Sequence, residues 1–368
     1  MLLASDLPGL KFSTSLRPSA DTPTASTLVV EVAEKRFDAN IRFDNRGTRA
    51  RGPFQLLTAA TVNNLFGNHE AVGLTYATVA SPKELQYVAA TYRQVLTSEG
   101  LTGFLNASYA WGHPGTADLE LLMFGTRSSS FEAGLSYPLV RARERNLTVT
   151  GLVFASDNKS EILNTTLNDD RIRGLRFRLD ADAVDRWRGI NQVAITFSQG
   201  INGAGATPND NALASRPFGH VDFSKLEAYA SRSQPLLGNF SAAVAAYAQY
   251  AFTSLLAPEQ CGYGGRVFGR AFDPSALLAD NCWQLLGELR YDMRILALSV
   301  AQLYGFTDYG KVYTIKPLAG SPSSVSGASA GAGLRLGSQK SVVDLSGAKA
   351  IEGPRHGWRF FAAWTWQY

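Results

Sequence analysis

The sequence has no long apolar run and only modest charge. In its 368 residues there is no stretch of about 18 or more apolar residues, so no transmembrane helix is predicted. Charged residues make up 18% of the chain, the formal net charge is +4, and no run of Lys and Arg occurs. A nucleic-acid-binding surface requires clustered basic residues, so we expect no nucleic-acid partner.

Cysteine and histidine are also scarce. Two cysteines, Cys261 and Cys282, are too few for a disulfide scaffold, and none of the four histidines has metal-ligand spacing to another His or Cys. Phosphate-binding and dinucleotide-binding motifs are missing too, so the sequence predicts neither a metal nor a cofactor. The cysteines are either separate buried thiols or a disulfide that closes a loop of about 20 residues and stabilises it by roughly 3 kcal/mol. Both alternatives stay open.

Polar and apolar residues alternate along most of residues 36–368, which is the period of a β-strand. Leu289 and Tyr291, for example, share one face of a predicted strand, and Glu288 and Arg290 share the other. Glycine is abundant, with 34 residues, and aromatic residues make up 11% of the chain. Such alternation fits both a soluble antiparallel sheet and a transmembrane β-barrel.

Two features favour a barrel in lipid over a soluble sandwich with an aromatic core strand. The polar faces carry dense charge of both signs, as the wall of a water-filled lumen does. The last predicted strand has an unbroken apolar and aromatic face, and aromatic girdles at a membrane interface are built in this way. The residues of this face are Trp358, Phe360, Ala362, Trp364, Trp366 and Tyr368.

Turn residues divide the barrel region into sixteen predicted strands, an even number as a closed single-chain barrel prefers. We therefore predict an all-β fold, a sixteen-stranded antiparallel transmembrane β-barrel. The predicted strands are 36–46, 52–63, 68–80, 84–96, 100–112, 128–140, 145–157, 171–185, 190–202, 220–236, 239–253, 283–296, 298–311, 326–337, 340–351 and 357–368.

Residues 1–35 have a different pattern. Two strands, Lys11–Arg17 and Thr27–Ala33, flank a loop rich in Pro, Thr and Ser. Because two strands alone are marginally stable, this segment is interpreted as the remnant of a small α+β domain. The first residues, MLLASDLPGLKF, lack the basic region and unbroken apolar stretch of a signal peptide, so for an exported protein we expect the signal to precede this sequence.

The segment 254–282 does not follow the strand pattern. A loop of this length is usually functional or disordered, and its aromatic residues and four glycines oppose disorder. It contains Arg270, in Gly269-Arg270-Ala271-Phe272. On the predicted strand 298–311, Phe306 and Asp308 share one face, so Asp308 points inward if that face lines the lumen.

These motifs resemble the outer-membrane polypeptide-transport superfamily, in its two-partner-secretion branch of hemolysin-activator and filamentous-hemagglutinin transporters. In that family loop six folds into the lumen of a sixteen-stranded barrel. The Arg of its Val-Arg-Gly-Phe/Tyr tip pairs with the Asp of a Phe-x-Asp-x-Gly motif on the wall. The matching residues here are Gly269-Arg270-Ala271-Phe272 and Phe306-x-Asp308-x-Gly310. The flanking residues that share the likeness are Glu259-Gln260, Gly264-Gly265, Asp280, Glu288-Leu289-Arg290-Tyr291 and Asp44-Asn45-Arg46-Gly47.

The resemblance implies a latch between Arg270 and Asp308, with loop six at about 254–282 inside the lumen. Gly269 replaces the usual Val and Ala271 the usual Gly, which puts the backbone shape of the tip in doubt. The resemblance also implies that residues 1–35 are the C-terminal part of a polypeptide-transport-associated (POTRA) domain and that residues 36–368 form the barrel.

The implied function is a monomeric pore in the bacterial outer membrane, surrounded by outer-membrane lipid. It would export one large secreted partner protein, an adhesin or cytolysin, and would not be an enzyme. Three alternatives stay open: an outer-membrane assembly factor, a diffusion porin, and a barrel enzyme such as an outer-membrane lipase. The pattern G-x-S-x-G at 327–331 lacks the strand–turn–helix context of a nucleophile, so we do not predict catalysis there.

Overall fold

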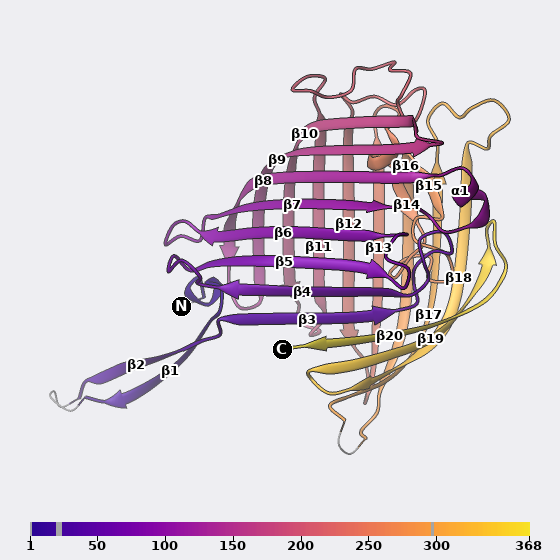
Figure 1. The fold of residues 1–368 in the computed structure, drawn as a ribbon. Coiled ribbons are helices and arrows are strands. Elements are labelled where there is room, and N and C mark those ends of the chain that lie inside the picture. The colour runs from indigo at the N-terminus through magenta and orange to yellow at the C-terminus, as the bar shows by residue number, and fades with distance from the viewer. Residues whose placement is uncertain (1, 20–23, 296–297) are drawn as a thin grey trace.

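The computed structural model describes residues 2–19, 24–295 and 298–368, and sixteen antiparallel strands between Phe37 and Gln367 form one closed barrel (Figure 1). The predicted fold class is confirmed. The barrel strands are β3 (Phe37–Asp44), β4 (Gln55–Asn63), β5 (Glu70–Val79), β6 (Gln86–Val95), β7 (Thr102–Gly112), β8 (Gly125–Arg141), β9 (Arg145–Ile162), β10 (Thr165–Val184), β11 (Ile190–Gly200), β12 (Ser224–Pro235), β13 (Phe240–Ala251), β16 (Asn281–Asp292), β17 (Val300–Tyr313), β18 (Ser324–Gly337), β19 (Ser341–Glu352) and β20 (Gly357–Gln367).

The alternation of the sequence sets the two faces of this wall. On β17, Leu303 is 50% exposed on the outside, whereas Asp308 is 3% exposed on the inside. On β16 too, the apolar Leu289 is exposed on the outside and the charged Glu288 is buried on the inside. A surface of exposed apolar side chains around a polar interior is the pattern of a barrel that faces lipid.

The two ends of the barrel differ in their connections. The turns 142–144, 185–189 and 236–239 are short and lie at the end from which the N-terminal segment extends, whereas 201–223 and 252–280 are long loops at the other end (Figure 1). In outer-membrane barrels short turns face the periplasm and long loops face the cell exterior. We therefore orient the barrel with its short turns toward the periplasm and its long loops toward the cell exterior.

The strands β9 and β10 are longer than predicted. β9 continues to Ile162, and β10 begins at Thr165. A tight turn at Leu163 and Asn164, which both have positive φ, joins the two strands. The sequence between them is polar, and we expected a loop there. Backbone pairing does not require apolar side chains, so the two strands continue as a polar ribbon above the apolar band.

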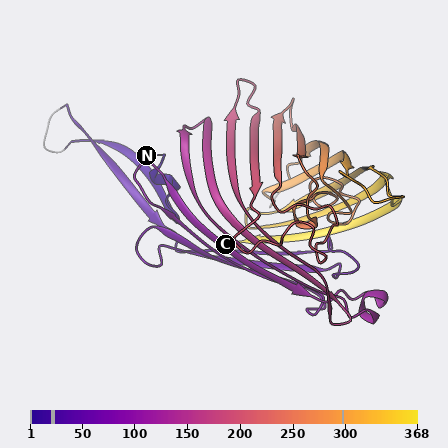
Figure 2. The ribbon, with the colours of Figure 1, turned by 90° about the horizontal axis from the view of Figure 1, so that it is seen from above.

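The N-terminal segment forms a hairpin beside the barrel. It contains the short helical turn η1 (Ala4–Asp6) and the strands β1 (Leu10–Pro18) and β2 (Ser26–Glu34), which confirm the two predicted strands. Figure 2 shows this hairpin projecting from the barrel. Residues 1 and 20–23 of the predicted 1–35 segment, and residue 296 of the predicted strand 283–296, lie outside the described residues.

Helix is almost lacking in the described part of the chain. The helix α1 (Ala117–Leu121) lies in the connection between β7 and β8, and η2 (Ala257–Glu259) is a single turn. In residues 2–19, 24–295 and 298–368, no helix has the length and apolar character needed to cross a membrane.

The segment between β13 and β16, residues 252–280, is called loop six below. It contains two short paired strands, β14 (Cys261–Tyr263) and β15 (Leu277–Ala279). The expectation that 254–282 holds no strand was wrong here, because three-residue strands are too short to show an alternating pattern. A buried cluster around Tyr263 and Phe272 packs loop six against the inner side of the barrel wall.

Candidate functional site

Loop six reaches inward-facing side chains on opposite sides of the barrel. Glu259 forms an ion pair with Arg176 of β10 at 2.8 Å between Oε1 and Nη2. Arg266 pairs with Asp44 at the end of β3. Since β10 and β3 stand on opposite sides of the ring of strands, the loop spans the lumen between them.

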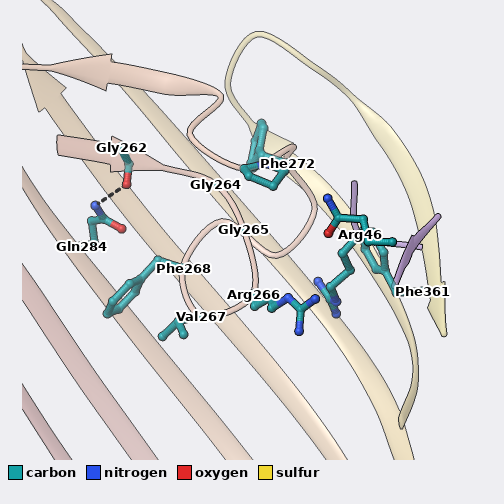
Figure 3. A pocket seen from close by; sticks show the side chains of 12 residues that line it. Arg46, Gly262, Gly264, Gly265, Arg266, Val267, Phe268, Phe272, Gln284 and Phe361 are labelled. Atoms are coloured by element: carbon teal, nitrogen blue, oxygen red, sulfur yellow. Dashed lines mark hydrogen bonds between the residues drawn. The ribbon is translucent and has the colours of Figure 1, made fainter. Parts of the chain in front are cut away.

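The base of loop six is bonded to the wall. Cys261 and Cys282 form a disulfide, with their Cα atoms 6.3 Å apart, so the disulfide is the alternative that the structure contains. Beside it the Gln284 side chain on β16 donates a hydrogen bond to the Gly262 carbonyl at 3.0 Å (Figure 3). The paired strands β14 and β15 complete this base.

The tip of loop six is fixed through the carboxylate of Asp308. The backbone N–H groups of Gly269 and Arg270 donate to it at 2.9 and 3.3 Å. The hydroxyls of Tyr263 and Ser329 donate at 2.6 and 2.7 Å. Four donors thus satisfy the buried carboxylate of Asp308. We predicted that Asp308 contacts the Arg270 side chain, whereas in the structure it contacts the backbone of the tip.

Arg270 has a different ionic partner from the predicted one. Its Nη1 lies 2.5 Å from Oε2 of Glu288, and its guanidinium lies over the ring of Phe306, 4.5 Å from the centroid. The predicted ion pair of Arg270 with Asp308 is therefore wrong. Glu288 is directly opposite Phe306 in the register of β16 and β17, so Arg270 reaches Glu288 across the Phe306 ring, while Asp308 is already occupied.

Glu288 is the centre of a charge cluster. Its side chain is fully buried, and it also accepts from Arg290 at 2.6 Å and from Arg335 at 3.1 Å. Arg335 in turn pairs with Asp344 at 3.1 Å. Charge-assisted hydrogen bonds of this kind are the strong ones, and loss of a buried carboxylate among arginines costs roughly 3–5 kcal/mol.

The glycine of the wall motif makes room for an aromatic ring. A Cβ on Gly310 would lie 2.3 Å from Cδ2 of Tyr263, and one on Gly327 would lie 2.6 Å from its Cε1. Tyr263 is fully buried on these two glycines and packs against Phe272 with 5.6 Å between ring centroids. Burial, followed by the charge of Asp308, raises the pKa of the Tyr263 phenol, so Tyr263 stays a hydrogen-bond donor.

The residues of the tip that differ from the family motif are compatible with the backbone conformation of the tip. Gly269 has φ +67°, and a Cβ there would lie 2.7 Å from Cα of Gly264. A β-branched residue is strongly disfavoured at such a position, so Gly in place of Val suits this conformation. Ala271 and Phe272 are both buried against the wall.

Several contacts of the site were not predicted from the sequence. Asp273 pairs with Arg355 and Arg359, each at 2.8 Å. Between the tip and the wall lies a cavity of 360 Å³, into which Arg46 and Arg266 project (Figure 3). Glu288 was placed on the polar face of its strand, but alternation gives the face of a residue and not its partner across the lumen.

Ser329, in the G-x-S-x-G pattern, lies on β18 and donates its hydroxyl to Asp308, in no strand–turn–helix context. Across the three described stretches of the chain, no group of His, Cys, Asp and Glu side chains has the arrangement of a metal site. The tip is thus attached to the wall by hydrogen bonds and ion pairs.

Comparison with known proteins shows the family of the chain. The family model described as "Haemolysin secretion/activation protein ShlB/FhaC/HecB" matches residues 25–335. The outer membrane transporter CdiB of Dickeya dadantii is 21% identical over 284 residues, which cover 72% of this chain and 48% of the relative. The chain thus spans about half the length of this curated relative.

Two solved structures share the fold. CdiB from Escherichia coli has a TM-score of 0.80 at 18% identity, covering 100% of this chain and 69% of that one. CdiB from Acinetobacter baumannii has a TM-score of 0.74 at 16% identity, covering 98% and 65%. The molecule is a bacterial outer-membrane β-barrel, and since the family match covers most of its length, the chain belongs to the haemolysin secretion/activation protein family ShlB/FhaC/HecB.

Proposed function

We propose that this chain is the pore of a two-partner-secretion transporter, which exports one large secreted protein such as an adhesin or cytolysin. The observation that carries the proposal is the attachment of loop six across the lumen. Its tip is held by Asp308 and Glu288 through hydrogen bonds and ion pairs. A diffusion porin for small solutes has no need of a closure that can be released, so the porin alternative has less support.

The polar character of this attachment supports a latch. A pore wide enough for a polypeptide must be closed at rest, and the closure must open without unfolding the barrel. Hydrogen bonds and ion pairs of the tip can be exchanged for contacts with water or with a passing chain at modest net cost. Arg270, Asp308 and Glu288 are the residues proposed to form the latch. The family match is to secretion proteins, which favours export over the assembly-factor alternative.

We further propose that residues 1–35 are the C-terminal part of a POTRA domain on the periplasmic side. The hairpin of β1 and β2 exposes Leu16, Leu28 and Val32. A two-stranded sheet with exposed apolar residues is marginally stable alone, which supports its being part of a larger sheet. The partner protein would engage the periplasmic side as an extended strand. The pore would act as a monomer in outer-membrane lipid and would catalyse no reaction.

Secretion of the partner tests this function. Bacteria that carry the full-length transporter and the secreted protein encoded beside it should release that protein into the medium. Deletion of the transporter should trap it in the periplasm, and Arg270→Ala should change the amount released, because the tip of loop six would no longer be held at rest. Arg178→Ala is the matched control, because Arg178 lines the lumen too but forms its ion pair with Asp180 on its own strand, β10, and not with loop six. Equal release with and without the transporter would reject the proposal.

A further inference from the structure

Two turns at the short-turn end of the barrel carry four exposed arginines that form no ion pair with a described carboxylate. They are Arg143, Arg145, Arg186 and Arg188, called the basic rim below. Their two turns are neighbours, since the backbone N–H of Val184 donates to the carbonyl of Glu144 at 2.8 Å. Among the ion pairs of the described residues, none involves an arginine of the basic rim. Of the carboxylates in these turns, Asp185 pairs with Arg232 and Glu144 lies exposed between Arg143 and Arg145, so the four arginines leave an excess of positive charge facing solvent.

The opposite ends of the same strands are different. Lys159 pairs with Glu161 at 2.8 Å, and Arg173 pairs with Asp157 at 2.6 Å. Arg171 lies 3.7 Å from Asp169. At the long-loop end, basic residues on β9 and β10 thus form ion pairs with acidic residues. The arginines of the basic rim form no such ion pairs.

Exposed apolar side chains adjoin the basic rim. Trp187 is 60% exposed, and Leu237, in the next turn, is 91% exposed. The side chain of Gln234 donates to the Trp187 carbonyl at 2.8 Å and ties these two turns together. The Arg186 guanidinium lies over the indole, 4.3 Å from its centroid. Indole, leucine and guanidinium groups together are the composition of a membrane–water interface.

The basic rim also continues the lipid-facing side of the wall. In the alternation of β9, Arg145 is in phase with Val149 and with the exposed Val153. The position of Arg145 is thus the periplasmic edge of the band that faces lipid. A polybasic segment at such an edge attracts anionic lipid headgroups.

We propose that the basic rim binds the phosphate groups of anionic phospholipids in the periplasmic leaflet of the outer membrane. Trp187 and Leu237 would enter the interfacial layer beside them. The inference rests on the proposed function, since it requires the short turns to face the periplasm. The other candidate occupant is an acidic polypeptide. The outward position of Arg145 and the exposed apolar side chains favour lipid, because a soluble acidic chain provides no apolar environment for them.

Lipid binding can be measured on the purified barrel by native mass spectrometry with phosphatidylglycerol or phosphatidylcholine added. The test variant replaces Arg143, Arg145, Arg186 and Arg188 by Gln. The matched control replaces four basic residues at the other end of β8, β9 and β10 by Gln, namely Arg127, Lys159, Arg171 and Arg173. We expect the test variant to lose phosphatidylglycerol affinity by about 10-fold or more, and the control to keep it. Phosphatidylcholine binding should be weak in all three proteins.

A second measurement needs no variant. Binding of phosphatidylglycerol to the unaltered barrel in detergent should weaken steeply between low and high salt, because exposed charges are screened. Equal loss in test and control variants, or equal affinity for both lipids, would overturn the proposal. Unchanged lipid binding with impaired secretion in the test variant would assign the basic rim to a polypeptide instead. Lipid binding is measured without export, so failure here is distinguishable from failure of the proposed function.

Discussion

At the scale of single residues, the proposed latch divides its contacts between two carboxylates. Asp308 holds the backbone of the tip, and Glu288 holds the Arg270 side chain. The motifs in the sequence identified Arg270 and Asp308 as site residues. The strand pattern also placed Asp308 inside the barrel, but neither signal could give the partner of the guanidinium. That choice depends on the strand register and on the other donors to Asp308, which only the folded chain brings together.

Glu288→Gln should loosen the tip more than any other single charge change in this cluster. Three arginines would remain around a neutral amide, at a cost of roughly 3–5 kcal/mol. Hydrogen–deuterium exchange of a peptide that contains residues 264–276 should become faster. Asp344→Asn serves as the control, since Asp344 pairs with Arg335 and not with the tip. Unchanged exchange in Glu288→Gln would show that Glu288 does not hold the tip.

Gly310→Ala should displace Tyr263 from the wall. The added methyl group would lie 2.3 Å from the ring, so the ring must move and its hydrogen bond to Asp308 must lengthen or break. The melting temperature of the folded barrel should fall. Gly287→Ala on the neighbouring strand is a matched control, because no atom lies within 4 Å of the added methyl group. An equal effect of both substitutions would mean that Gly310 contributes only strand flexibility.

At the scale of elements, we expect loop six to have a fixed base and a releasable tip. The base is joined to β16 by the disulfide of Cys261 and Cys282, whereas the tip is held by polar contacts. Between them lie Gly264 and Gly265, with φ of +118° and +138°, values that glycine adopts readily. We therefore expect the tip to move about this glycine pair while the base stays on the wall.

The disulfide should limit how far loop six opens. In Arg270→Ala with the disulfide intact, faster hydrogen exchange should be confined to residues 264–276. Adding Cys261→Ser and Cys282→Ser should extend it to the hairpin of β14 and β15. The cysteine substitutions without Arg270→Ala are the control and should leave the tip protected. Opening of the whole loop while the disulfide is intact would contradict the division into base and tip.

At the scale of the whole molecule, the barrel was predictable because its signals are local. Alternation and turn residues gave sixteen strands, and most boundaries differ from the structure by a few residues. The polar ribbon of β9 and β10 and the short pair of β14 and β15 were missed, because their strands form by backbone pairing without an apolar pattern. The path of loop six across the lumen depends on contacts between Glu259 and β10 and between Arg266 and β3, which are far apart in sequence.

Single-channel conductance in planar lipid bilayers tests the central claim most directly. The measurement compares the unaltered chain with Arg270→Ala, Glu288→Gln and Asp308→Ala, and with Arg178→Ala as control. We predict a small and noisy conductance for the unaltered chain and the control, and a larger conductance for the three latch variants. The same steady, open conductance in all five proteins would contradict a latched loop six and would favour a simple diffusion pore.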